Sequence, residues 1–162
     1  MDDLPVGTEA RRPPPRQATL ALLVGRITTI KLAYWAALTA FELVLPLDGR
    51  PHDERFGSSI AFAVLATFVA ILWANRSARA IDARAGALSR SIPTVATTFA
   101  AASVVASPAS LPLLLVERQR SIEGCAGLIT CHPEALWLWV ATLVIGLLVI
   151  PAVFAGSLRS SR

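Results

Sequence analysis

Residues 91–116 read SIPTVATTFAAASVVASPASLPLLLV, a run of 26 residues without a charged side chain. Two further uncharged runs, 56–75 and 135–158, contain 20 and 24 residues. A fourth stretch, 18–47, is as apolar overall but carries three charged residues. Because about 20 apolar residues span the hydrocarbon core of a bilayer as a helix, the pattern predicts an all-α membrane protein with four transmembrane helices in a small bundle.

The composition supports one membrane domain and little else. Of the 162 residues, 54% are hydrophobic and 16% are charged, against roughly 25% charged in a soluble domain. Mixed charge and three consecutive prolines in residues 1–17 favour a disordered cytoplasmic tail. A transmembrane domain follows at 18–158, and a cytoplasmic C-terminal tail at 159–162. The spans are expected at about 27–47, 56–75, 91–116 and 135–157.

The third span differs from the others because Ala, Ser, Thr and Val make up most of it. Small residues let helix backbones approach closely in lipid, so we expect this helix to be the most buried in protein. Pro108 and Pro112 remove backbone donors near its end, which predicts a kink or break there. In the fourth span, Gly146 is the expected point of close approach to another helix.

The first stretch holds three candidate intramembrane charges, Arg26, Lys31 and Glu42. For Arg26 and Lys31 we expect snorkelling or contact with lipid phosphates, with an ion pair to a partner subunit as the alternative. An intramembrane carboxylate is a functional hypothesis, so Glu42 is a candidate for binding a cation or proton. The interpretation that we prefer places Glu42 at the outer interface, solvated or paired with an arginine. The arginines expected near that surface are Arg50, Arg55, Arg118 and Arg120.

Arginines are distributed unevenly over the segments that connect the spans. Nine lie in the N-terminal tail, the connection between spans two and three, and the C-terminal tail, whereas four lie in the other two connections. The positive-inside rule therefore places both termini in the cytoplasm. Four of the nine are expected to lie against anionic lipid headgroups: Arg76, Arg79, Arg84 and Arg90. The tryptophans expected at membrane interfaces are Trp73, Trp137 and Trp139.

Cys125 and Cys131 fall in the connection that this orientation places outside, where a disulfide persists. We interpret them as a structural disulfide that closes a small loop. Two alternatives are a redox-active pair and a zinc site completed by His132 and Glu134.

Sequence motifs point to no particular reaction. Both histidines, His52 and His132, fall outside the spans, which disfavours a haem held between membrane helices. The sequence shows no nucleophile elbow, phosphate-binding loop, dinucleotide fingerprint or nucleic-acid motif. We therefore predict no catalytic residue, no metal and no cofactor, although a bound lipid or quinone would fit such a bundle.

The function expected from these features is that of an accessory or structural subunit of a larger membrane complex, with lipids and other membrane subunits as partners. Arginine almost entirely replaces lysine, and Lys31 is the single lysine. This bias favours a GC-rich bacterial genome and hence the bacterial cytoplasmic (inner) membrane. Two alternatives stay open: a small oligomeric transporter with Glu42 as its ion- or proton-coupling carboxylate, and a membrane thiol-disulfide oxidoreductase that uses Cys125 and Cys131.

Overall fold

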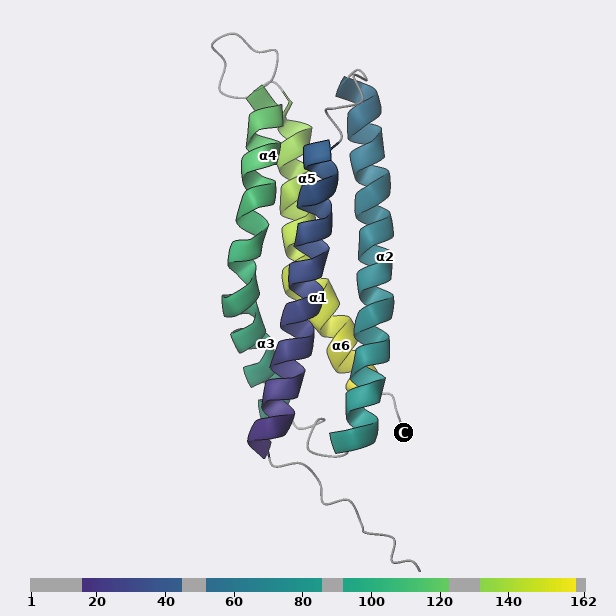
Figure 1. The fold of residues 1–162 in the computed structure, drawn as a ribbon, viewed down its shortest axis with the longest axis vertical. Helices are drawn as coiled ribbons and strands as arrows, with labels where there is room; N and C mark the ends of the chain where they lie inside the picture. Colours follow the sequence, from purple (N-terminus) through teal and green to yellow (C-terminus); the bar gives the residue numbers. More distant parts are fainter. Residues whose placement is uncertain (1–15, 45–51, 86–91, 123–131, 160–162) are drawn as a thin grey trace, which may run out of the picture.

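The described part of the chain contains four long helical rods, which run mostly along one axis (Figure 1). The computed structural model describes residues 16–44, 52–85, 92–122 and 132–159. Every residue in those ranges except His132 is helical, so the described part of the chain contains no strand. The helical elements are α1 (Arg16–Val44), α2 (His52–Ala85), α3 (Ile92–Ala106), the 3₁₀ turn η3 (Ser107–Ser110), α4 (Leu111–Ile122), α5 (Pro133–Val144), the π-helical turn η4 (Ile145–Val149) and α6 (Ile150–Arg159). The first rod is α1 and the second is α2. The third rod consists of α3, η3 and α4, and the fourth of α5, η4 and α6.

Each rod contains a segment that is long and apolar enough to cross a membrane, as the sequence predicted. The segments are Gln17–Val44, Glu54–Ala83, Val95–Ile122 and Pro133–Leu158. This length and composition indicate an integral membrane protein. The helices extend beyond the predicted spans. In particular, α1 is continuous from Arg16, so Arg26 lies within a helix rather than before its start.

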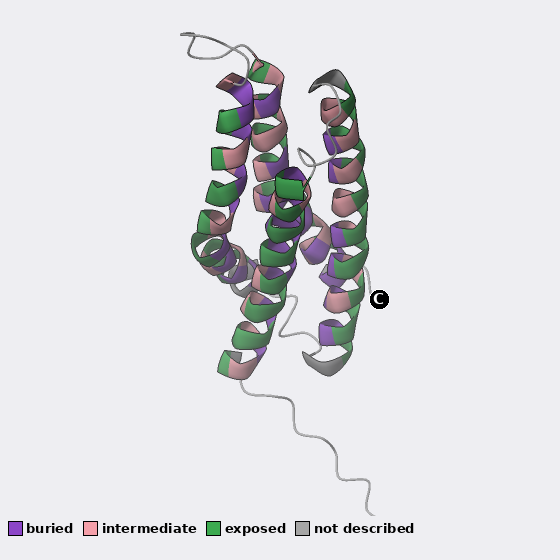
Figure 2. Cartoon of the chain, turned by 45° about the horizontal axis from the view of Figure 1, so that its top comes forward, coloured by how far each residue is buried: buried purple, intermediate pink, exposed green. Residues whose placement is uncertain are grey.

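The third rod is interrupted where the prolines predicted an interruption. α3 ends at Ala106, and η3 then runs from Ser107 to Ser110 with Pro108 in its first positions. Proline has no N–H to donate to the α-helical hydrogen-bond pattern, and the tighter turn accommodates that loss. Figure 2 shows the rod bending at this point.

α1 occupies the centre of the bundle. It packs against α2 and α3 along much of its length and also contacts α4 and α6. The fourth rod crosses the bundle, because α5 packs beside α4 whereas α6 packs beside α2 (Figure 1). α1 therefore touches all three other rods.

Burial follows this arrangement, with buried residues facing inward on each rod (Figure 2). The expectation that the third span would be the most buried is wrong, because the segment in α1 is more buried. α1 fills the core with large side chains such as Trp35, Ile27 and Leu23. α3, in contrast, leaves Val104 and Val105 exposed. Small residues permit close packing, but a central position determines how much of a helix is covered.

The crossing of the fourth rod depends on a close contact between η4 and α1. A Cβ atom on Gly146 would lie 2.5 Å from Cζ2 of Trp35, a distance at which atoms overlap. Trp35 is fully buried and occupies the space that a side chain on Gly146 would need. The predicted close approach at Gly146 is confirmed, and the partner is the indole ring of α1.

Candidate functional site

Charged side chains converge inside the upper end of the bundle, the end formed by Val44, His52, Ile122 and Pro133 (Figure 1). Glu42 comes from the last turns of α1, Ser59 from α2, and Glu117 and Arg120 from α4. Glu42 is 2% exposed, Glu117 1% and Arg120 7%. We call these four residues the upper polar cluster. Their burial is unusual, because charged residues are almost never buried unless they are paired.

Arg120 holds the upper polar cluster together. Its Nη1 forms an ion pair with Oε2 of Glu42 and donates a hydrogen bond to Oγ of Ser59 at 3.2 Å. Its Nη2 donates to the backbone carbonyl of Glu42, also at 3.2 Å. The guanidinium thus joins α4 to both α1 and α2. Glu42 therefore pairs with Arg120, one of the four arginines that the sequence placed near it.

Glu117 precedes Arg120 by three residues, so both side chains lie on the same face of α4. Its Oε1 is buried and has no hydrogen-bond partner among the residues that the structure describes. The charged groups that act on its carboxyl group are Glu42 and Arg120. The cluster therefore contains two carboxyl groups and one guanidinium, whose ion pair is with Glu42.

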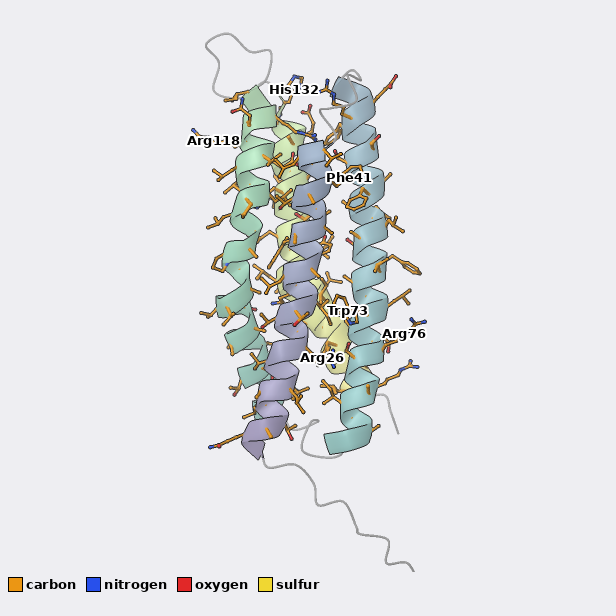
Figure 3. All side chains as sticks on the ribbon, viewed as in Figure 1. Arg26, Phe41, Trp73, Arg76, Arg118 and His132 are labelled. Carbon is orange, nitrogen blue, oxygen red and sulfur yellow. The ribbon has the colours of Figure 1, made fainter. Side chains whose placement is uncertain are left out.

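Because the uncharged run ends at residue 116, the sequence predicts that Arg118 and Arg120 lie in a connection outside the third span, and it indicates no role for Glu117. In the structure α4 continues to Ile122, which places both arginines on a helix. Arg118 points away from the bundle (Figure 3), whereas Arg120 points into it. The spacing of Leu113, Glu117 and Arg120 could have indicated both facts. These positions follow the helical period, so they predict that the helix continues beyond the uncharged run with all three side chains on one face.

A second buried polar contact lies lower in the bundle. Lys31 is 0% exposed, and its Nζ donates to Oγ of Ser103 in α3 at 3.0 Å. The ammonium group therefore points into the protein, instead of extending toward a helix end as snorkelling would require. Nearby, η3 satisfies its own polar groups, since Oγ of Ser107 donates to the carbonyl of Ser103 and Oγ of Ser110 donates to that of Ser107 at 2.8 Å.

Polar groups continue along α1 between these two contacts. Trp35 and Thr39 follow Lys31 by four and eight residues and so lie on the same side of the helix. Nε1 of Trp35 and Oγ1 of Thr39 are buried and have no hydrogen-bond partner among the described residues. The sequence does not reveal these two polar groups, because a tryptophan and a threonine are each ordinary residues of an apolar span.

The other predicted site residues lie at the surface or outside the described ranges. Arg26, Arg76 and Arg79 are exposed, and Figure 3 shows Arg76 pointing outward from α2. Arg84 lies in the last turn of α2. Arg90, Cys125 and Cys131 fall outside the described residues, so the disulfide and its redox and zinc alternatives stay predictions. His132 pairs through Nδ1 with Oε1 of Glu134 at 3.1 Å.

The predicted interface tryptophans occupy different environments. Trp137 is 70% exposed in the first turns of α5, and Trp73 is also exposed on α2. Trp139 is partly buried, and its Nε1 donates to the carbonyl of Ser110 at 3.3 Å. Trp139 therefore connects α5 to the interruption in the third rod.

An apolar groove of about 320 Å³ opens between α1 and α2. Alanines form part of its lining on both helices, with Ala33 and Ala37 on α1 and Ala66 and Ala70 on α2. Its larger lining side chains include Phe62, Leu65 and Trp73. The two helices are joined beside it, where Tyr34 Oη and Thr67 Oγ1 share a hydrogen bond of 3.1 Å. We call this feature the α1–α2 groove.

The side of α1 at this groove carries a row of small residues. Gly25, Thr29, Ala33 and Ala37 follow one another at intervals of four residues, and all four are exposed. The hydroxyl group of Thr29 donates to the carbonyl of Gly25 at 2.8 Å, so it is satisfied within α1. We call these four residues the small-residue row.

Comparison of the chain with protein-family models, with curated proteins and with solved structures finds no significant match.

Proposed function

We propose that this protein is an accessory or structural subunit of a larger membrane complex and that it binds a transmembrane helix of its partner at the α1–α2 groove. The observation that carries the proposal is the exposed small-residue row of α1 beside that groove. In lipid, helices associate through close packing of backbones, and small residues at such intervals permit it.

The dimensions of the row favour a helix as the bound partner. Gly25 and Ala37 are twelve residues apart, which corresponds to about 18 Å along a helix. A contact of that length matches more than three turns of a second helix packed along α1. Exposed Leu65 and Val69 of α2 would flank such a helix on one side, because both residues line the groove.

The proposed location is the bacterial cytoplasmic membrane, with both termini in the cytoplasm. The excess of arginines in the tails and in the connection after α2 supports this orientation. Arg76 and Arg79 are exposed on the lower part of α2, where they can contact anionic headgroups. The upper polar cluster would then lie near the outer surface.

Substitution of two residues of the small-residue row tests the proposal. In the double variant Ala33→Leu/Ala37→Leu, two bulky side chains fill the groove without removing a buried contact, because both alanines are exposed. After mild-detergent extraction from native membranes, mass spectrometry should show at least a tenfold loss of co-purified membrane subunits. Ala61→Leu is the matched control, because Ala61 is exposed on α2 and does not line the groove.

Two results would contradict the proposal. One is that the wild-type protein purifies from native membranes without any other membrane protein. The other is that the groove variant and Ala61→Leu retain their partners to the same extent. Size-exclusion chromatography of each variant distinguishes loss of the partner from misfolding.

A further inference from the structure

The upper polar cluster contains one more carboxyl group than its cation can pair. Arg120 directs Nη1 to Glu42 and Ser59, and Nη2 to the backbone carbonyl of Glu42. The contacts of both Nη atoms are thus with Glu42 and Ser59, and none is with Glu117. Glu117 is 1% exposed, and its Oε1 has no hydrogen-bond partner within the described residues. If both carboxyl groups were ionised, the cluster would carry a net charge of about −1 away from water.

A buried carboxylate without a partner is costly, and such a group avoids the cost by becoming neutral. We propose that Glu117 is a proton-binding site: its carboxylate takes a proton from water at the upper end of the bundle and returns it there, while Glu42 stays ionised against Arg120. The step is balanced, since hydronium gives one proton to the carboxylate and water is released. The proposal concerns Glu117 and is independent of helix docking at the α1–α2 groove.

The surroundings of Glu117 favour a proton over a metal ion. The guanidinium of Arg120 already occupies the cluster and repels a second fixed cation. Hard metal ions such as Ca²⁺ also require six to eight oxygen ligands, whereas no group of three or more acidic, histidine or cysteine side chains suited to a metal occurs among the described residues. A proton needs one oxygen and little space.

Each element packed around Glu117 contributes few other charges. α1 contributes Glu42, and α4 itself contributes Arg120 and the exposed Arg118. α2 contributes Ser59 and, about one turn before it, the exposed Glu54 and the half-buried Arg55. The Oγ of Ser59 donates to the backbone carbonyl of Arg55 at 3.0 Å. α5, which packs on α4, carries Glu134 in its first turn, and Glu134 pairs with His132, the residue immediately before α5. Glu42 and Arg120 are thus the buried charged groups that share the upper polar cluster with Glu117.

Infrared spectroscopy of the full chain in lipid nanodiscs tests the proposal, because a protonated carboxyl group gives a C=O stretching band that a carboxylate lacks. We expect this band at neutral pH in the wild-type protein and its disappearance at alkaline pH. Glu117→Gln should abolish the band, whereas Glu134→Gln, which changes a half-buried carboxyl group at the start of α5, should retain it. Exchange of sodium for choline in the buffer should not alter the band.

A second pair of variants identifies the group that holds the proton and does not depend on Glu117→Gln folding. Glu42→Gln frees Arg120 to pair with Glu117, so the band should disappear. Glu117→Asp should shift the band, because it replaces the protonated group itself. The proposal is overturned if the wild type shows no band at neutral pH, if Glu117→Gln or Glu42→Gln keeps it, if Glu117→Asp leaves it unshifted, or if sodium removes it.

Discussion

Arg120 shows how much one side chain can determine in an apolar bundle. Its guanidinium contacts a carboxylate, a hydroxyl and a carbonyl on two neighbouring helices. Bringing two charges out of water costs several kcal/mol per ion, and their attraction repays that cost when the geometry is good. Removal of one partner leaves the other charge buried and unpaired. This destabilises the fold much more than replacement of both partners by neutral groups does.

Replacement of Arg120 should therefore destabilise the fold strongly. We expect Arg120→Gln to lower the free energy of unfolding by about 3–5 kcal/mol, because it leaves Glu42 unpaired. Arg118→Gln, at an exposed position two residues earlier, should change it by no more than about 0.5 kcal/mol. Detergent-titrated unfolding followed by circular dichroism measures both. The double variant Glu42→Gln/Arg120→Gln should recover part of the loss, and equal effects of the two single variants would contradict this account.

At the scale of helices, the contact between α1 and the fourth rod determines how the bundle closes. The fourth rod leaves α4 and reaches α2 through the π-helical turn η4, and such turns accommodate an extra residue within a helix. Gly146 in that turn receives the indole ring of Trp35. The crossing thus requires a helix without a side chain at one position and a large ring at the facing position.

Addition of one methyl group at this crossing tests its tightness. Gly146→Ala should destabilise the protein by about 1–3 kcal/mol, the usual cost of overpacking a core, because the new Cβ would overlap the Trp35 ring. Gly156→Ala is the control, because a Cβ there meets no atom within 4 Å and alanine stabilises helices by about 0.5–1 kcal/mol relative to glycine. Thermal unfolding in detergent measures both.

A compensating substitution separates overpacking from a backbone effect. Trp35→Phe provides room for the added methyl group. Gly146→Ala should therefore destabilise the Trp35→Phe variant less than it destabilises the wild-type protein. If Gly146→Ala is as harmless as Gly156→Ala, or if Trp35→Phe changes nothing, the close contact does not govern the crossing.

For the molecule as a whole, the sequence predicted the number of apolar rods, the interruption near Pro108 and the close approach at Gly146. Those features depend on composition over about 20 residues or on single residues with special backbone properties. Neither kind of signal requires knowledge of which helix lies beside which. The helix ends were less predictable, because polar residues at the ends of uncharged runs continue the same helices.

The polar contacts could not be predicted for a related reason. The pairing of Glu42 with Arg120 joins residues 78 positions apart, and the contact of Lys31 with Ser103 joins residues 72 positions apart. Both depend on α1 lying against the third rod, which composition does not specify. Lys31 near a helix end would snorkel, but Lys31 in the central helix finds a partner inside.

Orientation in the membrane is the remaining property of the whole molecule, and labelling can test it. In a Cys125→Ser/Cys131→Ser background, we expect a membrane-impermeant maleimide to label Arg118→Cys in intact cells and to leave Arg79→Cys unlabelled. Both positions are exposed, and they lie toward opposite ends of the bundle (Figure 1). After permeabilisation both should react. The reverse pattern in intact cells would contradict the predicted orientation.

The central position of α1 also has a consequence for biosynthesis. Ribosomes add about 5–20 residues per second, so Arg120 leaves the peptidyl-transferase centre about 4–16 seconds after Glu42, which it follows by 78 positions. During that interval the nascent first helix holds an ammonium group and a carboxylate whose eventual partners have not been made. An insertion machinery or chaperone that retains the first helix until the third has emerged would keep its two charged side chains from facing lipid without a partner.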